Sequence, residues 1–159
     1  MIQTNHNHDL PYRPNVGIML INDKNQVFVG ARLDHPGNWQ MPQGGIDEGE
    51  EVIEAALREM DEEIGTCNAE LIDEMPGWLS YDFPDHLINR LWNGKYKGQK
   101  QKWVAFRFTG SDSDINLEKH HEPEFEEWRW FDIDELLKSV VPFKKDVYRT
   151  VIEYFTPKL

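Results

Sequence analysis

Three glutamates near the end of a predicted helix are the residues of this chain whose types and spacing best suit chemistry. Glu59, Glu62 and Glu63 fall within an arc of roughly 100° on a helical wheel. Like charges at this spacing repel, and anions in the last turn oppose the helix dipole, so the cluster predicts a bound cation. Carboxylate oxygens without neighbouring His or Cys suit Mg²⁺, with Mn²⁺ or another divalent ion as the alternative. A solvated acidic surface is the competing interpretation, because the net charge is -12.

A helix over residues 51–64 must position these carboxylates. Its apolar residues recur at the spacing of one helix face, namely Ile53, Ala56, Leu57, Met60 and Ile64. Gly65 is well placed to end the helix. The preceding Gly44 and Gly45 allow the backbone to approach a ligand closely, so the Gly44 carbonyl is a candidate metal ligand. Arg58 is expected to form ion pairs that orient the carboxylates.

The remaining pattern predicts strands around this helix and a second helix at the end of the chain. Residues 15–21 and 27–31 favour a β-hairpin, because two apolar segments flank a turn cluster. Further predicted elements are short strands at 39–43, 70–75 and 78–81, a strong strand at 104–108 and a final helix at 144–155.

Composition predicts one compact domain. The chain has 159 residues, of which 39% are hydrophobic and 29% are charged, which is enough for one buried core. We expect residues 1–10 to be a disordered N-terminus and residues 11–159 to form the single domain. Cys67 is the one cysteine, and the longest apolar run, Ile18 to Ile21, is too short for a membrane span. These features predict a cytoplasmic protein without membrane contact.

Basic residues gather in one segment of this acidic chain. Residues 86–111 contain six Lys and Arg residues, among them Lys100 and Lys102, and no acid. We interpret the segment as a positive track for a polyphosphate or an RNA 5′ end, the alternative being an exposed strand edge protected by lysines. Arg13 and Arg32 flank the predicted hairpin strands, where they either reach a phosphate or base or are ordinary surface charges.

The acidic helix and the loop before it match a known signature. Gly44, Glu50, Arg58 to Ile64 and Gly65 reproduce the Nudix box, G-x5-E-x7-R-E-U-x-E-E-x-G-U, in which U is a bulky apolar residue. The last position departs from it, because Thr66 replaces an aliphatic residue. Segments 12–17, 39–45, 98–103, 123–130 and 142–148 further resemble the bacterial RNA pyrophosphohydrolase branch of the Nudix family, which overlaps with enzymes described as dinucleoside polyphosphate hydrolases.

This resemblance implies a fold, a reaction and a set of site residues. The implied fold is the α/β Nudix fold, a mixed β-sheet in an α/β/α sandwich. The implied reaction converts 5′-triphosphate or diphosphate RNA ends to 5′-monophosphate ends, which initiates mRNA decay. The implied catalytic residues are Arg58, Glu59, Glu62 and Glu63, and the implied metal ligands are Gly44, Glu59, Glu62, Glu63 and Glu124. Candidate substrate-binding residues are Arg13, Arg32, Gln43, Lys100, Lys102, Val141, Phe143 and Lys144, with Phe143 stacking on a base.

Two alternatives remain open beside RNA 5′ ends. The same phosphoanhydride chemistry serves dinucleoside polyphosphates such as diadenosine tetraphosphate. A non-catalytic nucleotide- or RNA-binding Nudix module is the alternative of another class. It predicts a degraded box, whereas Glu50, Glu59, Glu62 and Glu63 are all present. Either Glu62 or Glu63 is the candidate general base.

Overall fold

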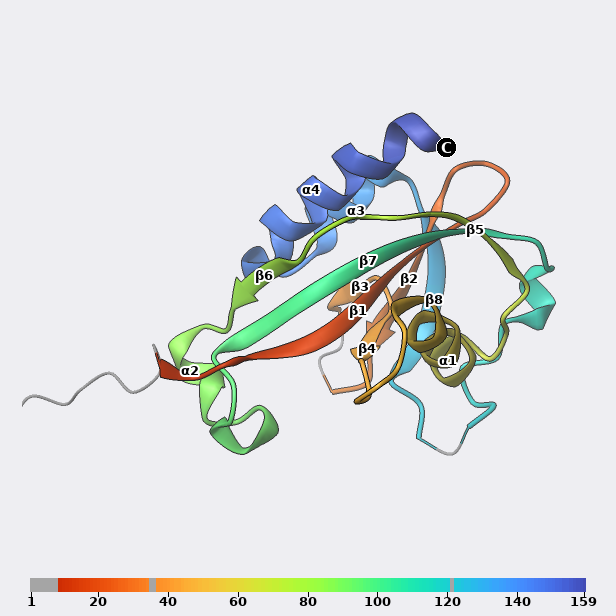
Figure 1. Cartoon of the computed structure of the whole chain (residues 1–159). Coiled ribbons are helices and arrows are strands. Elements are labelled where there is room, and N and C mark those ends of the chain that lie inside the picture. Colours follow the sequence, from red (N-terminus) through yellow and green to blue (C-terminus); the bar gives the residue numbers. More distant parts are fainter. Residues whose placement is uncertain (1–8, 35–36, 121) are drawn as a thin grey trace, which may run out of the picture.

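A mixed eight-stranded β-sheet with helices on both faces forms the domain (Figure 1). The computed structural model describes residues 9–34, 37–120 and 122–159. The strands are β1 (Tyr12–Ile21), β2 (Val27–Arg32), β3 (Trp39–Gln40), β4 (Gln43–Gly45), β5 (Ala69–Glu74), β6 (Leu79–Asp82), β7 (Gly98–Phe108) and β8 (Phe125–Phe131). The α-helices are α1 (Val52–Ile64), α2 (Asp85–Ile88), α3 (Ile133–Ser139) and α4 (Lys145–Phe155), and short 3-10 helices are η2 (Trp92–Gly94), η3 (Asp112–Asp114), η4 (Pro142–Lys144) and η5 (Thr156–Lys158).

The long strands β1 and β7 form the centre of the sheet. They run parallel, in register from the pair Tyr12 and Gly98 to the pair Ile21 and Arg107. The other strand pairs are antiparallel: β1 pairs with β2 and β4, β2 with β3 and β8, and β7 with β5 and β6. The sheet is therefore mixed, as predicted.

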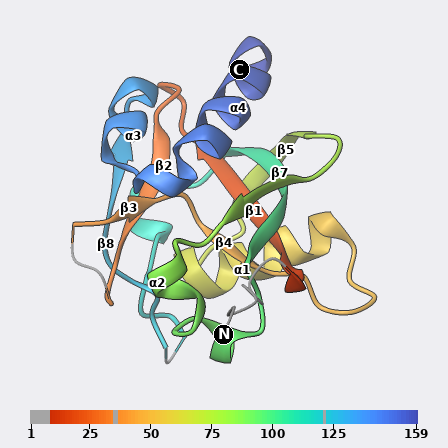
Figure 2. The same cartoon turned by 90° about the vertical axis from the view of Figure 1, so that its left-hand side faces the viewer.

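The alternating side chains of β1 and β7 supply two cores. One face, which includes Val16, Val104 and Phe106, packs against Ala56 and Met60 of α1. The opposite face carries Met19, Trp103 and Ala105, which pack against α3 and α4. Figure 2 shows α1 and α4 on opposite sides of the sheet. This arrangement confirms the predicted sandwich.

Local sequence signals explain the two longest helices. The helix α1 begins one residue later than predicted and ends at Ile64, as predicted. Gly65 caps it, with φ 85° and its N–H donated to the Asp61 carbonyl at 3.0 Å. The helix α4 buries the predicted apolar face, Val147, Tyr148, Val151, Ile152 and Phe155. Both helix predictions are confirmed.

Three features differ from the sequence-based expectations. The single strand predicted over 39–43 is two short strands, β3 and β4, separated at Pro42. The buried side of α1 includes Glu59 and Glu63, which are 8% and 7% exposed, whereas Glu62 is exposed, so only part of the acidic face is a solvated surface. Leu10, in the segment expected to be disordered, is partly buried against the core. The rest of that prediction concerns residues 1–8, which lie outside the described residues.

In the part of the chain that the structure describes, no helix has the length and apolar character needed to cross a membrane.

Candidate active site

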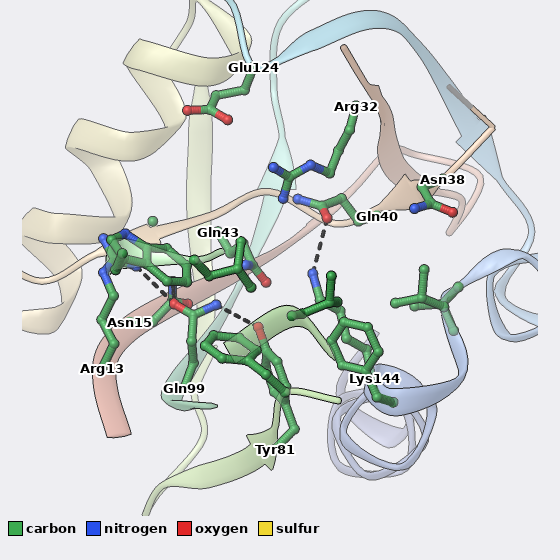
Figure 3. Close-up of a pocket in the computed structure, with 18 of the residues that line it drawn as sticks. Arg13, Asn15, Arg32, Asn38, Gln40, Gln43, Tyr81, Gln99, Glu124 and Lys144 are labelled. Atoms are coloured by element: carbon green, nitrogen blue, oxygen red, sulfur yellow. Dashed lines mark hydrogen bonds between the residues drawn. The ribbon is translucent and has the colours of Figure 1, made fainter. Parts of the chain in front are cut away.

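A cavity of about 760 Å³ between α1 and η4 brings most of the predicted site residues together (Figure 3). The predicted residues that line it are Arg13, Arg32, Gln43, Gly44, Glu59, Glu62, Glu63, Glu124, Val141, Phe143 and Lys144. Three others do not line it, namely Arg58, Lys100 and Lys102. The cavity therefore joins segments from both ends of the chain.

The loop before α1 lies directly against the carboxylates of the helix. Glu59 and Glu63 are one helical turn apart, so both point to the same side of α1. A Cβ atom on Gly44 would overlap the carboxyl group of Glu59, so only glycine leaves room for that carboxylate. The backbone of β4 at Gly44 thus lies directly against the carboxyl group of Glu59.

Arg58 ties four groups of this site together. Its guanidinium donates to both oxygens of Glu50, with Nε to Oε2 at 2.8 Å and Nη2 to Oε1 at 2.9 Å. Nη1 donates to Glu59 at 2.8 Å and to Glu62 at 3.4 Å, and Nη2 also donates to the Gly45 carbonyl at 2.8 Å. The hydrogen bonds from Arg58 lower the pKa of Glu50 to about 2. Arg58 therefore orients carboxylates, and it does so from outside the cavity.

The two buried glutamates favour a cationic partner. Burial raises the pKa of Glu59 to about 7 despite the bond from Arg58. Burial, together with the charges of Glu59 and Glu124, raises the pKa of Glu63 well above its usual range. Glu63 Oε2 is buried and accepts no hydrogen bond from the described residues. A hard divalent cation would satisfy this oxygen and relieve the repulsion, so the donor set fits Mg²⁺.

The carboxylates are not drawn together as metal ligands would be. Within residues 9–34, 37–120 and 122–159, no three His, Cys, Asp or Glu side chains form a group that could hold a metal ion. Arg58 pairs with Glu59 at 2.8 Å and with Glu62 at 3.4 Å. The metal ligands named above therefore remain predictions.

A network of side-chain amides lies on the cavity wall between β1 and β7. Gln99 Oε1 accepts from Arg13 Nη1 at 2.8 Å and from Asn15 Nδ2 at 3.0 Å, and Gln99 Nε2 donates to the Tyr81 hydroxyl. Gln101 Nε2 donates to Asn15 Oδ1 at 2.8 Å and to Gln43 Oε1 at 3.1 Å. Figure 3 labels the other members of this network. The network fixes Arg13 and Gln43 through neutral partners. Among the described residues the recorded hydrogen bond from the Arg13 guanidinium goes to Gln99, so its other donors suit an anion.

Four aromatic rings continue this wall. The centroid distance is 5.7 Å from Phe143 to Tyr81, 6.0 Å from Tyr81 to Phe83 and 5.6 Å from Phe83 to Trp92. The guanidinium carbon of Arg13 lies 4.5 Å from the Trp92 ring centroid. Tyr81 and Phe83 are buried, whereas Phe143 is half-buried and Trp92 is 39% exposed. The two outer rings therefore suit the stacking of nucleobases beside cations.

Cations lie on the other side of the cavity from Arg13. Lys144 is only 6% exposed, and its Nζ donates to Gln40 Oε1 at 3.1 Å. Burial and the charge of Arg32 lower the pKa of Lys144 to about 7. Arg32 forms a two-point ion pair with Asp34 at 2.7 and 2.6 Å. Figure 3 shows Gln40 between Arg32 and Lys144.

Lys100 and Lys102 lie elsewhere. Their ammonium groups are 4.7 and 5.1 Å from the ring centroid of Trp78. Residues alternate along β7, so Gln99 faces the cavity whereas its neighbour Lys100 faces away.

Several lining residues were not among the predicted ones, namely Asn15, Gln40, Tyr81, Phe83, Trp92 and Gln99. One signal was available for Gln99 and Gln101. Both are polar residues at alternate positions that lead into the predicted strand, in line with buried Trp103. The pairing of Asn15 with Gln101 depends on the parallel register of β1 and β7, which local sequence does not specify.

Comparisons with known proteins agree with this geometry. Residues 11–151 match the family model described as NUDIX domain. The RNA pyrophosphohydrolase of Rhodospirillum rubrum is 62% identical over 143 residues, which cover 90% of this chain and 86% of that protein. The RNA pyrophosphohydrolase of Rickettsia prowazekii is 52% identical over 148 residues, covering 92% and 91%.

Solved structures support the fold. The E. coli dihydroneopterin triphosphate pyrophosphohydrolase superposes with a TM-score of 0.70 at 22% identity, covering 94% of this chain and 99% of that one. A C. elegans Ap4A hydrolase superposes with a TM-score of 0.62 at 15% identity, covering 90% and 98%. The family model spans nearly all of the sandwich, and Gly44, Glu59, Glu62 and Glu63 of the box line one cavity, so the chain belongs to the Nudix family.

Proposed function

We propose that this chain is a Mg²⁺-dependent RNA 5′ pyrophosphohydrolase, which converts 5′-triphosphate or diphosphate RNA ends to 5′-monophosphate ends. The observation that carries the proposal is the meeting of the box glutamates, three cations and an aromatic wall at one cavity. The names of relatives at 52% to 62% identity support the choice of RNA as substrate. We expect the reaction to take place in the cytoplasm, as a first step of mRNA decay.

The carboxylates supply the acidic part of the mechanism. Glu59, Glu62, Glu63 and Glu124, with the Gly44 carbonyl, would hold the divalent ion. When bound, such an ion neutralises phosphate oxygens and lowers the pKa of coordinated water. Glu62 or Glu63 takes the proton from the attacking water. Arg58 keeps Glu59 and Glu62 in orientation throughout.

The cations and rings hold the substrate. Arg13, fixed by Gln99, and Lys144, fixed by Gln40, approach the cavity from two sides and neutralise the phosphate chain. Phe143 stacks on a base close to the Lys144 ammonium. Binding therefore fixes both the charge and the base of an RNA 5′ end.

Hydrolysis of dinucleoside polyphosphates is the second candidate function. The aromatic wall has a cation against a ring at two places, Lys144 at 5.8 Å from the Tyr81 ring centroid and Arg13 at 4.5 Å from that of Trp92. A ligand with a base at both ends of its phosphate chain suits that arrangement. Competition between triphosphorylated RNA and diadenosine tetraphosphate, compared by kcat/KM, decides between the two.

The substitution Glu63→Gln tests the proposed chemistry. It removes the buried, unsatisfied carboxylate with little change in volume, so we expect turnover of triphosphorylated RNA to fall at least about a hundredfold while folding persists. Asp61→Asn is the matched control. Asp61 lies on the same helix but pairs with Lys119 at 2.7 Å outside the cavity. Near-normal Mg²⁺-dependent hydrolysis by Glu63→Gln contradicts the assignment, and inactivity of the wild-type chain favours a non-catalytic binding module.

A further inference from the structure

Trp78, Lys100 and Lys102 form a surface of their own, here called the Trp78 patch. The exposed fraction of Trp78 is 45%, and both ammonium groups lie within 5.1 Å of its ring centroid. On β6 and β7 the patch lies on the opposite face from the residues that line the cavity, because Gln99 and Tyr81 point into the cavity and their neighbours Lys100 and Ser80 point away.

The two lysines carry charge that the protein does not neutralise. Some cations of this acidic chain pair with carboxylates, as Arg58 does with Glu50 and Lys119 with Asp61. In the described part of the chain, no such salt bridge involves Lys100 or Lys102, whose recorded contact is the Trp78 ring. Two neighbouring ammonium groups with no recorded carboxylate partner among the described residues favour an anionic ligand, even on a chain of net charge -12.

Protection of a strand edge does not account for these lysines. Edge strands use lysines to block pairing with other chains. The strand β7, however, pairs with β1 on one side and with β5 and β6 on the other, so it lies inside the sheet. The lysines project from a sheet face, next to an aromatic ring that is left half in solvent.

We propose that the Trp78 patch binds the RNA chain downstream of its 5′ end, with a base stacked on Trp78 and backbone phosphates at Lys100 and Lys102. This rests on the proposed function. Rings combined with cations are how proteins hold single-stranded nucleic acid without sequence preference, whereas an acidic peptide would leave the ring unused.

The sheet provides a short route between the two surfaces. Among the described residues, β6 pairs only with β7, so it forms the edge of the sheet beside the cavity. Tyr81 of β6 lies next to Phe143 in the cavity, and Trp78 immediately precedes the same strand. An RNA whose first bases occupy the cavity passes over this edge to reach the patch.

The experiment compares RNA lengths. The triple variant Trp78→Ser, Lys100→Gln, Lys102→Gln should raise KM for a long unstructured triphosphorylated RNA about tenfold and leave kcat unchanged. KM for a triphosphorylated dinucleotide, which is too short to leave the cavity, should not change. The control Lys24→Gln, Lys138→Gln removes the same charge from exposed positions in the β1–β2 turn and on α3. Unchanged kcat on the dinucleotide also reports that the triple variant is folded.

Direct binding separates this proposal from the proposed function. Fluorescence anisotropy with a 5′-monophosphorylated RNA of the same length requires no turnover, and we expect about tenfold weaker binding by the triple variant than by the control. Equal binding by both, or an equal change of KM on long and short substrates, overturns the patch. A wild-type chain that hydrolyses neither substrate overturns the proposed function, while the binding measurement still decides on the patch.

Discussion

Gly44 lies so close to Glu59 that a methyl group on Gly44 would occupy the position of the Glu59 carboxyl group. The Gly44→Ala variant must therefore displace a carboxylate that we expect to bind the metal. Because that carboxylate ends a flexible side chain, the fold survives, whereas kcat should fall at least about a hundredfold. Steady-state kinetics and circular dichroism check both outcomes. Gly49→Ala is the control, because its added methyl group meets no atom within 4 Å and costs only backbone strain at φ 80°. Equal activity of both variants would contradict this role of Gly44.

Arg58 should not be replaceable by lysine. Its fork reaches Glu50, Glu59 and the Gly45 carbonyl at once, within 2.9 Å of each, and an ammonium group has no matching geometry. We expect Arg58→Lys to lower kcat about ten- to a hundredfold, with a smaller effect on KM, since the residue lies outside the cavity. Kinetics at saturating Mg²⁺ test this. A change in KM alone would instead mean that Arg58 contacts the substrate.

Glu50 should make the protein sensitive to acid. Its pKa is about 2 in the folded chain, below the ordinary 4.5, because the ionised form accepts two bonds from Arg58. A lowered folded-state pKa contributes stability above pH 4.5 that is lost as the pH falls towards 2. The Glu50→Gln variant should therefore lose less stability than the wild type over this window. Urea unfolding at several pH values measures the difference, and parallel loss in both proteins would refute the ion pair's contribution.

Sequence predicts the helix of this site better than it predicts the site's walls. The spacing of apolar residues predicts the buried apolar face of α1, and the place of Gly65 directly after the last of these residues predicts its positive φ. The burial of Glu59 cannot be predicted from the sequence. A helical wheel separates polar from apolar residues, but it does not show that β4 packs against one edge of the polar face.

The strand β7 gives the clearest example of this limit. The run of basic residues predicted that Lys100 and Lys102 bind the substrate, yet Gln99 of this strand lines the cavity and the two lysines do not. Successive side chains of a strand point to opposite faces, and only the packing of α1 and α4 decides which face meets the substrate.

Lys144 should lower the free energy of unfolding, although we expect it to bind the substrate. Lys144 is 6% exposed, and its amine has a pKa of about 7 rather than the ordinary 10.5, because burial disfavours its charged form. The unfolded chain therefore binds more protons between pH 7 and 10.5, so wild-type stability rises with pH across this window. Lys144→Met keeps the length of the side chain and removes the charge. We expect it to gain about 1–2 kcal/mol of unfolding free energy at pH 6 to 7, and we expect that gain to shrink as the pH rises to 10.

The same variant should bind substrate less well. Lys144→Met removes a buried cation that we expect to face the phosphate chain, so KM should rise about tenfold or more. Among the described residues, the other cation beside Gln40 is Arg32, which already pairs with Asp34. Chemical denaturation across this pH range and KM at pH 7 test the two effects separately. A variant less stable than the wild type at pH 6 would mean that the hydrogen bond to Gln40 outweighs the cost of burying the charge.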